Sequence, residues 1–256
     1  MRPVESWLSE SEATAIYSAD YWNDIEAEKK KPWWIEDGDY ERCRNYLRDS
    51  RLMLEYQQSE SWVRDMKRAD LRILDLAAGI GWTAALLSKL DCVAEVHAVE
   101  ISSHRLERLF PHAVTMFEAR AEKIFRYLGS FYDLKLPSAS MDVVYLSQAF
   151  HHADRPLQLL VECDRVLKPG GRILLIGEPA LSRLQIVRRF FSHVRRNGRP
   201  SLQFHELFPT DRETGDHYYQ RSEYFFMFQM LGYRAQQRIL GSGDLAYLAD
   251  KPPIDL

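Results

Sequence analysis

Residues 71–87 read LRILDLAAGIGWTAALL: a short apolar run, a glycine-rich turn and the start of a helical pattern. A strand, a turn and a helix in this order are typical of an open parallel sheet, where ligands bind beyond the carboxyl ends of the strands. Similar apolar runs alternate with amphipathic segments as far as residue 178, and this alternation predicts an α/β core. The runs are LRILDL (71–76), EVHAVE (95–100), VTMFE (114–118), MDVVYL (141–146) and GRILLIGE (171–178).

Two further runs near the C-terminus, RAQQRIL (234–240) and DLAYLAD (244–250), flank a short Gly-Ser-Gly loop. This pattern predicts a hairpin that adds an antiparallel terminal strand, so we expect a seven-stranded, mostly parallel sheet. Residues 69–256 form this predicted domain. It includes an insertion at about 179–232, which is too long for a plain crossover and is expected to contribute to a substrate pocket.

Residues 1–68 differ from the rest of the chain because they are rich in charges and aromatic rings, with a helical pattern from Tyr40 to about Lys67. We expect them to form an aromatic-rich helical N-terminal extension or cap. The six tryptophans all lie in the first 82 residues: Trp7, Trp22, Trp33, Trp34, Trp62 and Trp82. They are interpreted either as ordinary buried residues or as a lid that excludes water from a site.

The composition limits the classes of partner. A formal net charge of −3 argues against a protein whose main task is to neutralise nucleic-acid phosphates. No apolar run is long enough for a secretory signal or a transmembrane segment, so we expect a cytoplasmic protein. Cys43, Cys92 and Cys163 are widely spaced and lack a CxxC pair, and we expect no metal site.

The glycine turn allows two kinds of ligand. Gly79 and Gly81 fit the G-x-G-x-x-G/A pattern of dinucleotide-binding folds, and Glu100 ends the next strand where a ribose-binding acid is expected. Asp75 distinguishes the two, because a carboxylate near the end of the first strand would repel a pyrophosphate and attract an ammonium or a sulfonium group. The charge therefore favours a cationic cofactor over NAD.

Five ordered motifs resemble those of the class I S-adenosylmethionine-dependent methyltransferases over about residues 70–180. They are Asp75-Leu76-Ala77-Ala78-Gly79-Ile80-Gly81, Glu100, Ala119-Arg120-Ala121-Glu122, Ser147-Gln148-Ala149-Phe150-His151-His152 after a fourth strand, and Arg165-Val166-Leu167-Lys168-Pro169-Gly170-Gly171-Arg172. The resemblance implies a Rossmann-like three-layer sandwich and S-adenosylmethionine as the cofactor, with S-adenosylhomocysteine as its product. The cofactor-binding residues that it implies are Asp75, Ala77, Gly79, Gly81, Glu100, Ile101, Arg120, Ala121 and Ser147.

Two of these positions depart from the family pattern. Ala77 stands where the family often has Gly, and Arg120 where it often has the Asp that meets the adenine amino group. A guanidinium only donates hydrogen bonds. Arg120 is therefore expected to stack on the ring, or Glu118 or Glu122 supplies the acceptor, or the backbone provides the selectivity.

The candidate catalytic residues are His151 and His152, with His152 preferred, because they follow the strand where the transferred methyl group should emerge. A histidine there can take a proton from an acceptor, although it can also simply pack. The expected reaction is in-line methyl transfer to a small-molecule acceptor. The alternatives are a cofactor-binding protein without turnover, and an RNA methyltransferase.

Two segments outside the motifs have open interpretations. The arginine-rich helical segment 185–200 is read as a core-facing helix with a solvated basic face, as a membrane-surface or phosphate-binding helix, or as the element that would hold RNA. The aromatic run His217, Tyr218 and Tyr219 either lines the acceptor pocket or packs in the ordinary way.

Overall fold

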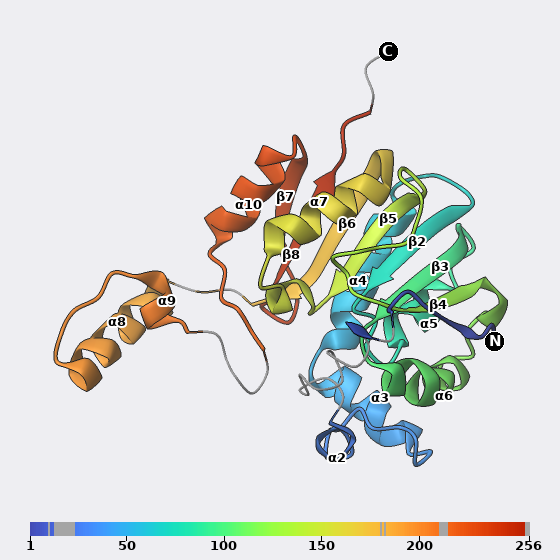
Figure 1. Ribbon diagram of the computed structural model, residues 1–256, viewed down its shortest axis with the longest axis horizontal. Coiled ribbons are helices and arrows are strands. Elements are labelled where there is room, and N and C mark those ends of the chain that lie inside the picture. The colour runs from blue at the N-terminus through green and yellow to red at the C-terminus, as the bar shows by residue number, and fades with distance from the viewer. Residues whose placement is uncertain (10, 13–23, 180, 182, 210–214, 254–256) are drawn as a thin grey trace.

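A computed structural model describes residues 1–9, 11–12, 24–179, 181, 183–209 and 215–253 (Figure 1). Within these residues an eight-stranded sheet has the order β1-β4-β3-β2-β5-β6-β8-β7. The strands are β1 (Val4–Ser6), β2 (Leu71–Leu76), β3 (Val93–Glu100), β4 (Ile124–Leu128), β5 (Met141–Ser147), β6 (Leu167–Glu178), β7 (Arg234–Ile239) and β8 (Leu245–Asp250). Strands β1 to β6 pair in parallel, and β8 pairs antiparallel with both β6 and β7. The predicted α/β fold and its terminal hairpin are confirmed.

The central strands are buried on both faces, which is why they read as nearly continuous apolar runs. Along β2 the side chain of Ile73 joins one core cluster and that of Leu74 joins the other. Helices α4 (Leu52–Arg64), α5 (Trp82–Leu87) and α6 (Phe110–Met116) cover the face of Ile73. Helices α7 (Pro156–Val166) and α10 (Arg221–Met230) cover the face of Leu74 (Figure 1).

The N-terminal part is not helical throughout. Residues Val4–Ser6 form β1, which extends the sheet beyond β4 as an eighth strand. Trp7 follows it and stacks on Tyr127 of β4 with ring centroids 4.3 Å apart. Helices α2 (Ile25–Glu28) and α3 (Tyr40–Asp49) come next, and the core beneath α3 includes Ile80 of the glycine turn. The N-terminal helices are thus packed at the carboxyl end of the sheet.

The predicted third core strand was wrong. The VTMFE run, residues 114–118, lies in α6 and the turn after it, because Phe110, Ala113 and Met116 are buried at helical spacing. The strand is β4, IFRYL, in which the buried Arg126 interrupts the apolar pattern and hid the strand.

Two helices between β6 and α10 form an arm, defined as residues 183–209. They are α8 (Arg183–Asn197) and α9 (Phe204–Leu207), and Figure 1 shows them standing away from the sheet. Among the described helices, α8 included, none has the length and apolar character needed to cross a bilayer.

Candidate functional site

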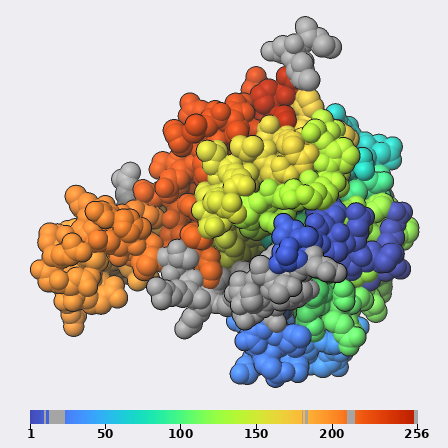
Figure 2. Space-filling model, in the orientation of Figure 1, coloured from blue at the N-terminus to red at the C-terminus, as the bar shows by residue number. Residues whose placement is uncertain are grey.

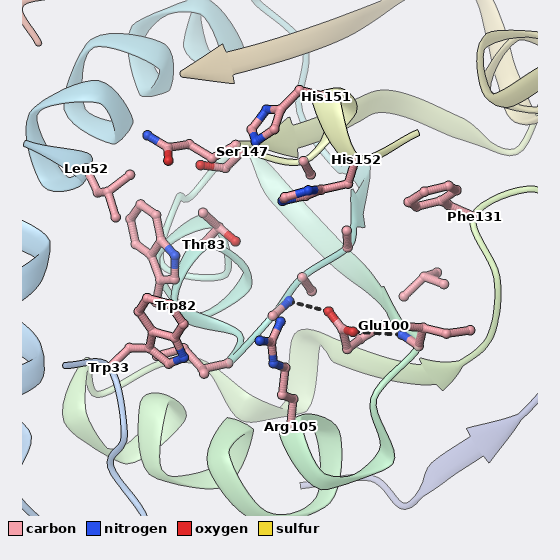
Figure 3. Close-up of a pocket in the computed structure, with 18 of the residues that line it drawn as sticks. Trp33, Leu52, Trp82, Thr83, Glu100, Arg105, Phe131, Ser147, His151 and His152 are labelled. Carbon is pink, nitrogen blue, oxygen red and sulfur yellow. Dashed lines mark hydrogen bonds between the residues drawn. The ribbon is translucent and has the colours of Figure 1, made fainter. Parts of the chain in front are cut away.

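A cavity of about 550 Å³ lies at the carboxyl ends of β2, β3, β4 and β5 (Figure 3). Its wall combines the glycine turn after β2 with the loops that follow the other three strands. Trp33 and Trp82 close one side in Figure 3, and His151 and His152 lie across from them. This is the position where open α/β sheets bind ligands.

The glycine turn has one glycine that faces the cavity and one that packs inward. A Cβ on Gly79 would meet no atom within 4 Å, whereas a Cβ on Gly81 would lie 2.3 Å from the ring of Phe110. Both glycines have positive φ, and so does Ala77 at 52°. Ala77 and Gly79 line the cavity and Gly81 does not. The turn therefore offers bare backbone to a ligand at Gly79.

Glu100 forms the part of the cavity wall that lies next to the glycine turn. Its Oε2 accepts a hydrogen bond from the Gly79 amide at 2.7 Å, and its Oε1 accepts from the amides of Ile101 and Ser102 at 2.8 and 3.0 Å. The carboxylate lines the cavity and is only 4% exposed. Each carboxylate oxygen can accept more than one hydrogen bond, so this group can also receive ligand hydroxyls.

Asp75 does not reach the cavity, contrary to the sequence-based prediction. Its side chain is fully buried beneath α5, where Oδ2 accepts a hydrogen bond of 2.7 Å from the Thr83 hydroxyl. Side chains alternate along a strand, and residue 75 points to the covered face. Burial raises the pKa of Asp75 to about 7. It is Thr83 that lines the cavity in its place.

Arg120 and Ala121 also lie outside the cavity lining. They precede β4 at its amino end, and the Arg120 guanidinium pairs with Asp91 at 2.7 Å. The misplaced third strand caused this error, because the loop that matters follows the carboxyl end of β4. That loop is Gly129-Ser130-Phe131-Tyr132, and all four residues line the cavity.

The loop after β5 brings titratable groups to the cavity. Ser147, His151 and His152 line it, together with Asp216 from the segment that follows the arm. Nδ1 of His151 lies 3.2 Å from Oε2 of the fully buried Glu178, and Nδ1 of His152 lies 3.2 Å from Oδ1 of Asp216. The two imidazole rings touch, with centroids 4.3 Å apart.

The two histidines have opposite pKa shifts. Burial disfavours the charged form of His151, but the Glu178 carboxylate outweighs it and raises the pKa of His151. Burial and the charge on His151 lower the pKa of His152 to about 4. At neutral pH His152 is therefore an uncharged and weakly basic imidazole at the cavity wall.

His151, His152 and Asp216 are also donor types that a metal ion could use, and their donor atoms lie within 4.8 Å of one another. The contacts with Glu178 and Asp216 already engage both imidazole rings in this arrangement.

The aromatic run at residues 217–219 is set back from the cavity. The His217 amide donates a hydrogen bond of 2.7 Å to the carbonyl of His151, and Tyr219 packs on Phe150.

Comparisons with known proteins agree with this geometry. Residues 74–175 match the family described as a methyltransferase domain. The chain is 31% identical over 129 residues to malonyl-[acyl-carrier protein] O-methyltransferase of Methylococcus capsulatus, covering 50% of this chain and 45% of that protein. It is 31% identical over 157 residues to demethylmenaquinone methyltransferase of Lactococcus lactis, covering 59% and 60%. The chain thus spans about half the length of these curated relatives.

A solved structure shares the fold. The SAM-dependent methyltransferase from Aquifex aeolicus superposes with a TM-score of 0.53 at 18% identity, covering 75% of this chain and 88% of that one. Residues 74–175 therefore form a methyltransferase domain of the class I S-adenosylmethionine-dependent family. The cofactor of this family is S-adenosylmethionine.

The cavity fits the methyltransferase cofactor on two observations of the chain itself. The space in front of Gly79 is open to a ligand backbone, and Glu100 presents a hydrogen-bond acceptor beside it. The motif that follows the third core strand in this family is matched by Gly129-Ser130-Phe131, with Ser130 in place of the usual Asp.

Several residues that line the cavity were not predicted from the sequence. Phe131 and Tyr132 were hidden by the misplaced strand. Arg105 and Lys31 also line the cavity, and the Arg105 guanidinium pairs with the buried Glu28 of α2. The position of Arg105, five residues after the acid that ends β3, is the only feature of the sequence that could have pointed to it.

Two of the six tryptophans line the cavity. Trp33 and Trp82 line the cavity, whereas Trp34 is buried against His104 and Trp62 packs on the core beneath α4. Trp22 lies outside the described residues.

Proposed function

We propose that this chain transfers the methyl group of S-adenosylmethionine to a small-molecule acceptor. The observation that carries the proposal is the hydrogen bond between the Gly79 amide and the Glu100 carboxylate in one wall of the cavity. This wall presents bare backbone and a carboxylate to the same ligand. The donor supplies an electrophilic methyl group on its sulfonium. The chain has to align an acceptor with that group and to exclude water.

Residues around the cavity divide this binding task. Glu100 would accept hydrogen bonds from the ribose hydroxyls, with Ile101 beside it, and Gly129 to Phe131 would contact the adenine. Ala77, Gly79 and Ser147 would lie against the rest of the cofactor. All of these residues line the cavity. Asp75 would act only indirectly, by holding Thr83 in the first turn of α5.

His152 is the proposed proton acceptor. It lines the cavity, and Asp216 lies 3.2 Å from its Nδ1 and can orient the ring. His151 would be a positioning residue, held by Glu178 against the ring of His152. Removal of a proton from an acceptor hydroxyl or amine makes that atom a better nucleophile.

A small acceptor suits the dimensions and the relatives. A cavity of about 550 Å³ has to hold the cofactor as well as the acceptor, so the space that it leaves suits a small acceptor. Two relatives are named for a malonyl group on a carrier protein and for a demethylmenaquinone. These names support an acceptor that is a small organic molecule, or a small group attached to a larger carrier.

The test is methyl transfer from isotope-labelled S-adenosylmethionine to a panel of small hydroxyl, amine and activated-carbon acceptors. We expect transfer by the full chain, and a loss of turnover on the order of 100-fold in His152→Ala with unchanged cofactor affinity. His217→Ala is the matched control, because its side chain does not line the cavity. Cofactor binding without transfer to any acceptor would favour a binding protein without turnover.

A further inference from the structure

The arm, residues 183–209, presents an apolar row to solvent. Leu184, Val187 and Phe191 lie at helical spacing on α8 and are 58%, 49% and 64% exposed. Leu202, which follows α8, is 89% exposed. Figure 2 shows the arm projecting from the rest of the molecule. The interpretation of α8 as a core-facing helix is therefore wrong for Leu184, Val187 and Phe191. Phe190, which lies outside this row, is half-buried.

The same arm carries an excess of positive charge. Residues 183–209 contain six arginines and a single acidic residue, Glu206. A hollow of about 580 Å³ between α8 and α9 gathers part of this charge, from Arg189, Arg196 and Arg199. Arg188 and Arg195 lie outside the hollow and are exposed. Glu206 lies 3.4 Å from Arg199 and 3.6 Å from His193, so one carboxylate offsets only part of the charge.

We propose that the arm binds the surface of an anionic phospholipid bilayer. Arg188 and Arg195 are exposed and lie three or four residues from Leu184 or Phe191, on the same side of α8 as the apolar row. These arginines would hold lipid phosphates, and the row of Leu184, Val187 and Phe191 would enter the boundary between headgroups and acyl chains. A helix with an apolar row and arginines around it has the chemistry of an interfacial helix. A protein partner would need an apolar groove that matches a projecting ridge, whereas a bilayer adapts to one.

The arm is joined to the cavity at both ends. The chain enters it after Glu178, which contacts His151, and leaves it before Asp216, which contacts His152. A bilayer would therefore be bound by a segment close in sequence to Glu178 and Asp216, which contact the two histidines of the proposed site. The inference itself does not depend on methyl transfer.

The test is co-sedimentation of the full chain with vesicles of phosphatidylcholine alone and with mixed phosphatidylglycerol–phosphatidylcholine vesicles. We expect binding to the mixed vesicles, and at least about tenfold weaker binding to phosphatidylcholine alone. Arg195→Glu and Phe191→Ser should each weaken binding to the mixed vesicles about fivefold or more. Both side chains are exposed, so melting curves should show folded variants.

Matched controls come from outside the arm. Arg238→Glu on β7 and Phe226→Ser on α10, where Phe226 is 60% exposed, should leave the affinity unchanged. Equal binding to both kinds of vesicle, or no binding to either, would overturn the inference. It would also be overturned if Arg195→Glu abolished binding while Phe191→Ser had no effect, because that result would indicate electrostatic attraction to an anionic surface without insertion of the apolar row.

Discussion

The amide of Gly79 donates a hydrogen bond of 2.7 Å to the carboxylate of Glu100. This contact joins the turn after β2 to the end of β3, two segments 21 residues apart in the chain. It fixes the carboxylate beside the bare backbone that faces the cavity. Every residue proposed to hold the cofactor is arranged around this pair.

Replacing the carboxylate should weaken cofactor binding. In Glu100→Gln an NH2 group takes the place of one carboxylate oxygen, so an acceptor is replaced by a donor. We expect the binding free energy of S-adenosylhomocysteine to weaken by about 1 to 3 kcal/mol. Calorimetric titration measures this loss, and a melting curve reports whether the turn is kept. Glu107→Gln, at an exposed position on the next helical segment, is the control. Unchanged affinity in Glu100→Gln would remove the ribose assignment.

A side chain on Gly79 should block the cavity. Gly79→Val places its methyl groups in the space that the ligand would occupy, and we expect cofactor binding to be lost. Part of any effect is backbone strain, since φ is +56° at this position. Gly38→Val separates the two causes, because Gly38 has φ of +82° and equally open space but lies away from the cavity. We expect Gly38→Val to be destabilised by about 1 to 3 kcal/mol and still to bind.

The adenine contacts should depend on the loop after β4. Phe131→Ala removes a ring from the cavity wall, and we expect an affinity loss of about 1 kcal/mol or more for S-adenosylhomocysteine. Arg120→Ala should leave the affinity unchanged, because Arg120 pairs with Asp91 outside the cavity lining. Calorimetric titration of both variants with S-adenosylhomocysteine shows which of the two positions contributes to cofactor affinity. A large loss in Arg120→Ala with none in Phe131→Ala would contradict the placement.

Stability should fall with rising pH because of Asp75. Its pKa is 3.8 in ordinary surroundings and about 7 in the fold. The folded chain therefore holds a proton that the unfolded chain releases, and the free energy of unfolding decreases between these two pH values, by at most about 1.4 kcal/mol per pH unit. Asp75→Asn should remove this slope.

Urea unfolding of the parent chain and Asp75→Asn across that pH window measures the difference in slope. Asp49→Asn, at an exposed position, is expected to keep the parent slope. Parallel curves for the parent chain and Asp75→Asn would show that Asp75 is already charged in the fold.

Much of the fold could be predicted because the decisive strands are buried on both faces. The runs at 71–76 and 141–146 contain only three charged residues, Arg72, Asp75 and Asp142, so their strand character was clear. The third core strand was missed for the opposite reason. Arg126 is buried there through contacts with the carbonyls of Leu106 and Arg2, which no local pattern reveals.

The site was predicted where local sequence determines geometry. The turn at Gly79 and the acid at Glu100 are set by adjacent strand ends, and both line the cavity. Asp216 and Lys31 could not be predicted, because they reach the cavity from distant segments through tertiary packing. The face to which Asp75 points also depends on the packing of α5, and the sequence alone did not define it.

The central claim is that the cavity beside Gly79 and Glu100 binds S-adenosylmethionine. The most direct measurement is calorimetric titration of the full chain with S-adenosylmethionine, S-adenosylhomocysteine and NAD. We predict binding of the two sulfur compounds in the micromolar range, about −8 kcal/mol, with none for NAD. Binding of NAD, or of none of the three, would contradict the account.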